Sequence, residues 1–404
     1  MNQQVISGKG ELGPVLVLDA AQRSALASIR SLGRRGVEVI ACDPDAEAIG
    51  FRSRHCARCL ISPDARERPA EFLAWLEEQA RAHPRAWILP ATDLSMSLLL
   101  RHREAFPRLL AAPGHDAYER ISDKALLAEL APQAGFVIPV TLSFAATEPP
   151  SAAALQAFPF PAVVKQALST FRTSQGVHRF TARYVDDAAS LSQALAKFPR
   201  DPELRLILQQ RVGGDGAGVF GLYRQGQRHA HFAHRRLREK PPSGGISVFS
   251  ESVPTDARQL ANLDRLAQML SWDGVMMAEF KHAANQEDVL IEINGRLWGS
   301  LQLAIDAGVD FPWLLYLLSS NAPMPPAPQY RVGRRLRWWL GDLDSLYLRL
   351  RDRELTPTAG AKLRALCSYF APRALVRDEL LRFDDPSPGW FALRQYALSL
   401  FKRS

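Results

Sequence analysis

The sequence predicts an α/β protein of several domains, the first of which contains a doubly wound parallel sheet. Short apolar runs of strand length alternate with helical patterns through the first 112 residues, which is typical of such a sheet. The chain has 404 residues, enough for two or three domains. Its 47% hydrophobic and 23% charged residues are ordinary for a globular protein and exclude a fibrous or mostly disordered chain.

The first predicted domain, residues 1–112, alternates strands with helices. The strands are predicted at Val15–Leu18, Val37–Ile40 and Trp87–Leu89, and the helices at Ala21–Leu32, Pro69–Ala82 and Leu94–Glu104. Gly8, Gly10 and Gly13 have the spacing of a dinucleotide-binding fingerprint. They precede the first strand, whereas the fingerprint needs its glycines between a strand and a helix N-terminus. A dinucleotide-dependent oxidoreductase is therefore excluded.

The second predicted domain covers residues 113–320 and includes a smaller lid subdomain at about 125–200. Ser122 is the expected N-cap of a helix over Asp123–Leu130. A glycine-rich turn is predicted at Gly213–Gly218. The remaining elements are predicted strands at Phe160–Lys165, Val177–Ala182, Leu204–Gln210, Val275–Lys281 and Val289–Asn294, and a helix at Leu260–Leu270.

A proline-rich linker, residues 321–330, precedes a basic helical region, residues 331–404. That region holds fifteen basic and eight acidic residues, and so carries +7 of the formal net charge of +8. The main body is nearly neutral, which argues against nucleic-acid binding there. Only residues 331–404 have the charge to meet a polyanion or a membrane surface. Their leucines favour a helical cap packed on the body, with an interfacial membrane helix as the alternative.

No segment predicts export or membrane insertion. The longest strongly apolar stretch, Phe311–Leu318, is far shorter than the roughly 20 residues that span a bilayer. Residues 1–14 contain no apolar segment typical of a secretory signal. We expect a cytoplasmic protein without a transmembrane segment.

Two predicted strands place acidic side chains opposite each other. In a hairpin centred on residues 285–286, Glu279 and Glu292 oppose each other directly, and Asn294 shares the face of Glu292 because side chains alternate. Two converging carboxylates repel unless a cation lies between them, and oxygen ligands suit Mg²⁺. A solvated sheet face near Lys281 is the alternative. The apolar neighbours of both glutamates argue against that alternative.

Three further cations are candidate anion ligands. Lys165 ends a strand beside a polar loop. Lys124 lies in the first turn of a helix, where it opposes the helix dipole unless an anion is close. Either lysine alone is equally typical of a solvated surface. Arg296 follows Asn294 by two residues, so it lies beside the proposed metal and could hold developing negative charge.

A cluster of arginines precedes the turn-forming sequence Pro-Pro-Ser-Gly-Gly. Arg235, Arg236 and Arg238 carry planar guanidinium groups that suit carboxylate or phosphate recognition. A solvated basic loop is the alternative interpretation of this segment.

In combination, these features resemble the ATP-grasp superfamily over about Val15–Asn321. The resemblance rests on Lys165 before a loop, Gln209–Val212 before a glycine-rich turn, Glu279 on one strand, and Glu292-Ile-Asn-Gly-Arg296 on the next. Residues 234–245 and 294–300 are similar to the carbamoyl-phosphate-synthetase-like branch of carboxylate–amine ligases. The resemblance implies an ATP-grasp fold preceded by a Rossmann-like parallel α/β domain. Here a C-terminal helical extension follows.

The resemblance also implies roles for individual residues. It places ATP phosphates on Lys124 and Lys165, the adenine hinge at Gln209, Gln210 and Val212, and the ribose near Asp215. It gives Mg²⁺, for which Mn²⁺ can substitute, the ligands Glu279, Glu292 and Asn294, and gives the acyl phosphate Arg296. We expect Arg235, Arg236 and Arg238 to recognise the acid substrate.

The implied activity is that of an ATP-dependent ligase. A carboxylate is activated as an acyl phosphate and then joined to an amine, with release of ADP and phosphate. The expected partners are ATP and small-molecule acid and amine substrates, with no nucleic acid. A homodimer is the commonest arrangement for such enzymes.

Two departures from the family pattern favour an alternative function. The lid loop Ser169–Gly176 has one glycine where the family usually has more, and Gln210 stands where an acidic residue is usual. Together with the basic residues 331–404, these departures suggest an ATP-binding module without ligase activity. Such a module would dock on a partner or membrane surface through its C-terminal region.

Overall fold

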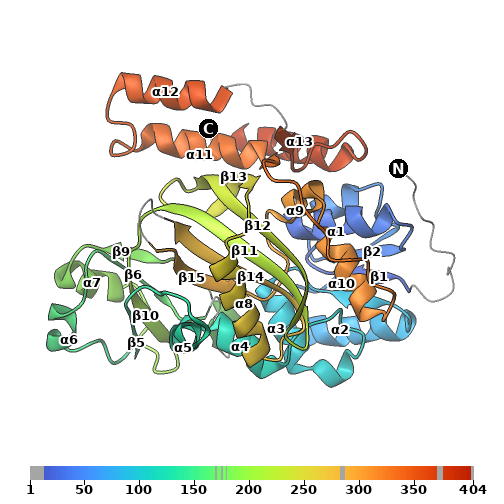
Figure 1. Cartoon of the computed structure of the whole chain (residues 1–404), viewed down its shortest axis with the longest axis horizontal. Coiled ribbons are helices and arrows are strands. Elements are labelled where there is room, and N and C mark those ends of the chain that lie inside the picture. Colours follow the sequence, from blue (N-terminus) through green and yellow to red (C-terminus); the bar gives the residue numbers. More distant parts are fainter. Residues whose placement is uncertain are drawn as a thin grey trace.

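The computed structural model describes residues 13–168, 171–173, 176–178, 180–282, 287–370 and 376–401. Its architecture consists of a four-stranded sheet near the N-terminus, a second four-stranded sheet, a seven-stranded sheet and a two-stranded ribbon. Figure 1 shows the N-terminal domain in blue and the small middle sheet in green at opposite ends of the molecule, with the C-terminal helices along one side. The predicted α/β class with a helical C-terminal region is confirmed.

The N-terminal domain contains the predicted parallel sheet, in the strand order β3-β2-β1-β4. β1 is completely buried because it lies between β2 and β4. The strand β3 was not predicted, since most of its side chains are exposed at the sheet edge and it lacks an apolar run. The elements are β1 Val15–Val17, α1 Arg23–Gly33, β2 Val39–Asp43, η1 Ile49–Arg52, β3 Arg58–Ile61, α2 Pro69–Ala82, β4 Trp87–Leu89, α3 Asp93–Arg101 and η2 Arg103–Ala105.

Two helices lead from this domain into the small sheet, α4 His115–Ser122 and α5 Lys124–Leu130. The predicted N-cap is wrong, because Ser122 is the last residue of α4. Asp123 caps α5 instead, and its carboxylate accepts hydrogen bonds from the backbone N–H groups of Ala125 and Leu126.

The small sheet is antiparallel, in the strand order β5-β10-β6-β9. The predicted strand Val177–Ala182 is wrong in extent, since β8 ends at His178 and β9 begins at Arg183. Half of the lid loop Ser169–Gly176, namely residues 169, 170, 174 and 175, lies outside the described residues. The elements are η3 Ala131–Ala134, β5 Thr141–Ala145, α6 Ala152–Gln156, β6 Ala162–Gln166, β7 Phe171–Thr173, β8 Gly176–His178, β9 Arg183–Val185, α7 Ala188–Leu195 and β10 Arg205–Gln210.

The large sheet has the order β15-β14-β11-β12-β13-β16-β17. Its two longest strands, β11 and β12, form a hairpin where the sequence predicts a glycine-rich turn and a basic loop. These strands were not predicted, because a segment so rich in arginine is typical of a solvated loop. In the structure, acidic side chains of neighbouring elements neutralise the arginines. The strands and the helices among them are β11 Asp215–Arg224, β12 Gln227–Lys240, β13 Ile246–Ser252, α8 Ala257–Met269, β14 Gly274–His282, β15 Val289–Asn294, α9 Leu301–Ala307 and α10 Phe311–Ser319.

The N-terminal domain and the large sheet share a continuous core. Leu16 and Ile88 of the parallel sheet belong to the same buried cluster as Met276 and Ala278 of β14. The two domains therefore pack as one body, which holds the N-terminal helix α1 in a fixed place beside the large sheet. Among the described residues no single helix is long and apolar enough to cross a membrane; α9 and α10 pass that test only as a pair bent by 90°.

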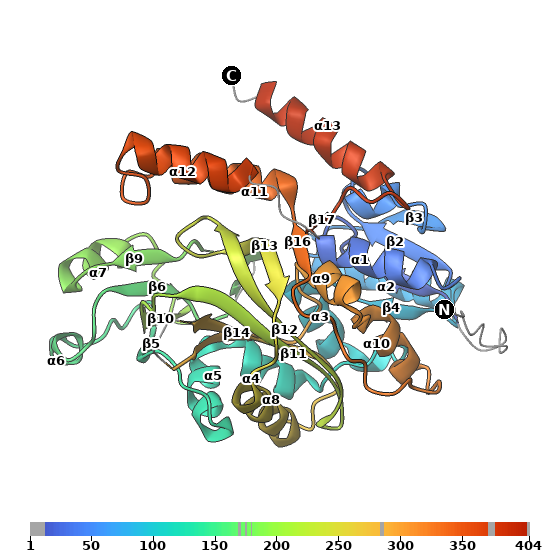
Figure 2. The same cartoon turned by 45° about the horizontal axis from the view of Figure 1, so that its top comes forward.

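The C-terminal region packs on the body and also extends the large sheet. β16, Arg335–Arg337, pairs with β13, and β17, Val376–Asp378, pairs with β16. The helices α11 Trp339–Arg351, α12 Ala359–Phe370 and α13 Ser387–Phe401 lie on one side of the molecule in both views (Figures 1 and 2). The predicted helical region thus also contains strands.

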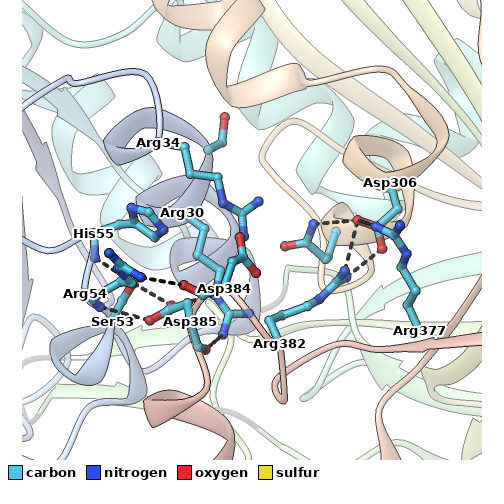
Figure 3. A network of polar contacts seen from close by, with 12 residues as sticks. Arg30, Arg34, Ser53, Arg54, His55, Asp306, Arg377, Arg382, Asp384 and Asp385 are labelled. Atoms are coloured by element: carbon cyan, nitrogen blue, oxygen red, sulfur yellow. Dashed lines mark hydrogen bonds and ion pairs between the residues drawn. The ribbon is translucent and has the colours of Figure 1, made fainter.

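Ion pairs join the C-terminal region to α1. Arg30 is buried, and its Nε donates to Oδ2 of Asp385 at 2.8 Å (Figure 3). The same aspartate accepts from the Ser53 hydroxyl and from the Arg54 backbone N–H. Arg30 also donates to the Glu379 and Leu380 carbonyls, so all three nitrogens of its guanidinium group donate to residues far from its own helix.

Candidate active site

A cavity of about 770 Å³ lies between the small sheet and the large sheet. Both sheets contribute side chains to it, and so does α1 of the N-terminal domain. Ten of the thirteen residues predicted for the site line this cavity. They are Lys124, Lys165, Gln209, Gln210, Val212, Arg236, Glu279, Glu292, Asn294 and Arg296.

The acidic centre of the cavity has the predicted hairpin register. Glu279 of β14 pairs directly with Glu292 of β15, and a bulge follows at Phe280. Asn294 shares the face of Glu292, since its Nδ2 donates to Glu292 Oε1 at 3.0 Å. The hairpin turn itself, residues 283–286, lies outside the described residues.

Each glutamate has a cation beside it. Lys124 Nζ lies 3.9 Å from Glu292 Oε2, and Arg236 Nη2 lies 2.5 Å from Glu279 Oε2. Burial alone would raise the pKa of Glu292, but the charge of Lys124 and the Asn294 hydrogen bond lower that pKa to about 2. Burial raises the pKa of Glu279 despite the opposing charge of Arg236. The surrounding residues therefore favour the ionised form of Glu292 more strongly than that of Glu279.

Lys124 and Lys165 approach the acidic centre from the small sheet side. The Lys124 N–H donates to the Ala167 carbonyl at 3.0 Å, which ties the start of α5 to the end of β6. Burial, followed by repulsion from Lys124, lowers the pKa of Lys165 to about 8. Glu292 and Glu279 oppose that shift. Two lysines this close repel each other, so the pair is suited to bind an anion that would offset both charges.

The predicted hinge lies at the end of β10. The Gln210 N–H donates to the Val140 carbonyl and the Arg211 N–H to the Pro161 carbonyl. Neither N–H group is therefore available to bind a ligand. The Val212 N–H makes no hydrogen bond with the described residues. The cavity lining also includes the apolar side chains of Val163, Leu168, Met277 and Ile291, of which Val163 is paired with Gln209 in the small sheet. A flat apolar group that also accepts a hydrogen bond fits such an edge.

Arg296 is held from the N-terminal domain. Its Nε lies 3.0 Å from Asp93 Oδ2, in the first turn of α3. Burial would lower the pKa of Arg296, but the charge of Asp93 raises it above the ordinary value. The guanidinium therefore stays charged and points into the cavity from a fixed anchor.

Three predicted site residues lie elsewhere, which corrects their assignment. Arg235 pairs with Glu251 at 2.6 Å, on the opposite face of β12 from Arg236. Arg238 makes two hydrogen bonds to Asp342 of α11, at 2.6 and 2.5 Å. Asp215 lines a separate cavity of about 200 Å³ together with Arg238. Alternation places Arg235 on the face away from Arg236, and an irregularity in the pairing of β12 with β13 around Arg238 accompanies the turn of Arg238 toward α11. Of the three arginines only Arg236 lines the main cavity.

Space for Arg236 comes from the glycines of β11. A Cβ atom at Gly216 would lie 2.7 Å from Arg236 Cδ and 2.5 Å from Glu239 Oε1. The side chain of Arg236 thus crosses the neighbouring strand only because residue 216 has no side chain. The glycine-rich segment predicted as a turn is in fact a strand that leaves room for the arginine.

Sequence reasoning missed several residues of the cavity. Arg23, at the start of α1, contacts Glu379 of the C-terminal region and stacks on Trp338. Glu239 holds Arg236 and Lys281 by ion pairs. Arg23 could not be recognised from the sequence, because the residues that it contacts at the cavity lie 224 or more positions away along the chain.

Comparison with solved structures gives the fold. N5-carboxyaminoimidazole synthetase from Staphylococcus aureus complexed with ADP is 14% identical, with a TM-score of 0.59 over 79% of this chain and 80% of that chain. L-amino acid ligase from Bacillus licheniformis is 15% identical, with a TM-score of 0.59 over 80% and 78%. Biotin carboxylase from Campylobacter jejuni is 14% identical, with a TM-score of 0.60 over 81% and 75%. The chain has the ATP-grasp fold.

No protein-family model matches the sequence, and no curated protein sequence matches it either. The ATP-grasp fold is therefore visible in the arrangement of sheets, while sequence identity to the three solved structures is 14–15%. In this ATP-grasp chain the cavity lies between the two sheets that the fold brings face to face. Glu279, Glu292 and the two lysines all point into that space.

Proposed function

We propose that the protein is an ATP-dependent ligase that activates a carboxylate as an acyl phosphate and joins it to an amine. The observation that carries the proposal is the convergence of Glu279, Glu292 and Asn294 with Lys124 and Lys165 in one cavity of an ATP-grasp fold. Solved structures of this fold include an ADP complex of N5-carboxyaminoimidazole synthetase and an L-amino acid ligase.

The charge of the cavity suits a nucleoside triphosphate. Seven cationic and three acidic side chains line it, so its net charge is positive. Lys124 and Lys165 would contact the phosphates. The apolar edge beside Gln209–Val212 would take the adenine, with the Val212 N–H as a hydrogen-bond donor.

The acidic centre fits Mg²⁺ by the chemistry of its donors. Among the described residues no group of three or more His, Cys, Asp or Glu side chains forms a metal site. Glu279, Glu292 and Asn294 instead offer two carboxylates and an amide oxygen, and phosphate oxygens would complete the ligand set. A Mg²⁺ ion held there would neutralise negative charge that develops during phosphoryl transfer.

The reaction needs positioning more than covalent help from the protein. A carboxylate oxygen of the acid attacks the γ-phosphorus in line, and the bond to the β–γ bridging oxygen breaks to release ADP. The amine nitrogen then attacks the acyl carbon, phosphate leaves, and the nitrogen loses a proton. Arg296, fixed by Asp93, would hold the negative oxygen of the acyl phosphate. Arg236 would face the acid from the large sheet.

A hydroxylamine trap tests this proposal. Purified protein with Mg-ATP and a panel of amino acids, sugar acids and small carboxylates should release ADP and form a hydroxamate only when the right acid is present. Reactions without acid or without ATP are the controls. If the protein binds Mg-ATP but no acid in a broad panel yields hydroxamate, the ATP-binding module without ligase activity becomes the better interpretation.

ATP affinity should fall as pH rises through about 8. Burial and Lys124 lower the pKa of Lys165 to about 8, so this lysine is charged below that pH and neutral above it. Loss of its charge removes a charged hydrogen bond to phosphate, and we expect about tenfold weaker binding at pH 9.5 than at pH 7. Calorimetry at pH 8 should also show proton uptake on binding.

Matched variants separate the two lysines. Arginine stays charged across this range, so Lys165→Arg should bind ATP with little pH dependence. Lys124→Arg should keep the pH dependence, because Lys165 is unchanged. A Lys165→Arg variant that retains the full pH dependence would assign the titration to another group.

A further inference from the structure

Exposed apolar side chains are concentrated in the C-terminal helices. Thirteen of the twenty large hydrophobic side chains that are exposed among the described residues lie between Trp339 and Leu400. Scattered exposed leucines are normal on protein surfaces, but a concentration in one region marks an interaction surface.

On α13 three of the four exposed apolar side chains occupy a single face. Trp390, Leu393 and Leu400 are 60%, 45% and 51% exposed, at a spacing that places them on one side of the helix. The opposite side contacts the body. There Phe391 lies against Arg52, and Gln395 donates a hydrogen bond to Glu47. The helix is thus held by that side and turns Trp390, Leu393 and Leu400 outward.

The same pattern occurs on α12. Leu363 and Phe370, 61% and 67% exposed, lie on one face, while Ala365 and Tyr369 are buried on the other. Lys362 and Arg364 flank Leu363 on both sides of this apolar face. Both helices lie on the same side of the molecule in the two views (Figures 1 and 2).

Charges in the C-terminal region are segregated. Five of its eight acidic side chains pair with basic residues of the body: Asp342 with Arg238, Asp344 with Lys240, Glu379 with Arg23, Asp384 with Arg34 and Asp385 with Arg30. Its outer cations have no such partners. Arg349, Arg353, Lys362, Arg364 and Arg394 are exposed and form no ion pair with the described residues. Packing of the C-terminal region on the body therefore pairs most of its acidic side chains and leaves these cations on the outer surface.

We propose that this outer surface binds an anionic lipid bilayer. The surface consists of the apolar residues Leu363, Phe370, Trp390 and Leu393 with the cations Lys362, Arg364 and Arg394. Apolar and aromatic side chains beside basic ones suit the boundary between headgroups and acyl chains, where both find partners.

Other partners fit this surface less well. A two-fold dimer through it would bring the same unpaired cations of two copies together, and these would repel. A nucleic acid would satisfy the cations through its phosphates, but it would leave the aliphatic side chains of Leu363 and Leu393 without an apolar environment. Only an anionic bilayer matches the charge and the apolar area at once.

Co-sedimentation of the full-length protein with lipid vesicles tests the proposal. Binding to vesicles with 30 mol% phosphatidylglycerol should exceed binding to pure phosphatidylcholine by about 10²-fold, at roughly fivefold for each of the three basic residues near the surface, and should weaken with added salt. The charge variant Lys362→Glu/Arg364→Glu/Arg394→Glu should abolish the preference for anionic vesicles. The apolar variant Trp390→Ser/Leu393→Ser should reduce binding to both kinds.

Matched controls keep the test specific. Ile61→Ser and Met269→Ser change exposed apolar residues on other elements and should bind vesicles like the unchanged protein. All variants lie at exposed positions, so circular dichroism should show the same thermal unfolding for each. Absence of binding to anionic vesicles overturns the proposal. So does a dimer in light scattering that the apolar variant converts to a monomer, because the face would then join two copies.

Discussion

Replacing Glu292 by alanine is expected to reduce ATP turnover by about 10²–10³-fold, since a lost metal ligand removes several kcal/mol of charge stabilisation from phosphoryl transfer. Glu292 is the carboxylate that the chain holds most firmly ionised, with Lys124 close by and Asn294 donating to it. Its loss should also remove one of the two negative charges that act on Lys165, the other being Glu279. ADP release, measured over a range of Mg²⁺ concentrations, checks this expectation.

The matched control is Glu287→Ala, on the same hairpin. Glu287 pairs with Arg258 near the surface and does not line the cavity. It should retain turnover close to that of the unchanged protein, and its thermal unfolding should be similar. Equal turnover in Glu292→Ala and Glu287→Ala would remove the acidic hairpin from the proposed mechanism.

Replacing Arg30 by alanine should destabilise the protein by about 3–5 kcal/mol, because the substitution leaves a buried charge without its partner. Asp385 is almost completely buried and would lose the guanidinium that faces it (Figure 3). The Glu379 and Leu380 carbonyls would each lose a donor. The C-terminal region should then detach more readily from α1. Urea unfolding and limited proteolysis of residues 376–401 measure both effects.

Arg34→Ala provides the comparison on the same helix. Arg34 pairs with Asp384, whose side chain is 55% exposed, so the loss should be about 0–1 kcal/mol. Similar destabilisation of the two variants would mean that the C-terminal region is held mainly by apolar contacts rather than by the buried ion pair.

The burial of Glu379 links this interface to the active site. Glu379 contacts Arg23, which lines the cavity, and the neighbouring Arg30 binds the Glu379 carbonyl. Residues of the C-terminal region therefore position one wall of the cavity, although they contain none of the residues predicted for the site. Residues 331–404 are therefore part of the folded body and do not form a separate basic tail.

The hairpin that carries Glu279, Glu292 and Asn294 was predictable because its determinants are local. Alternating side chains and a short link specify which residues face each other, and a slip by one residue would have turned the glutamates to the other face. The parallel sheet of the N-terminal domain was predictable for the same reason, since its buried strands are short and strongly apolar.

The sequence by itself therefore determined the α/β class, the acidic hairpin and the two lysines that face it. Only the tertiary structure decided which of the three neighbouring arginines enters the cavity. Arg235 and Arg238 are bound by Glu251 and Asp342, and the latter lies 104 residues away. Arg23 likewise reaches the cavity through contacts with Trp338 and Glu379. Such pairings depend on how distant elements pack, and local periodicity carries no information about distant charge partners.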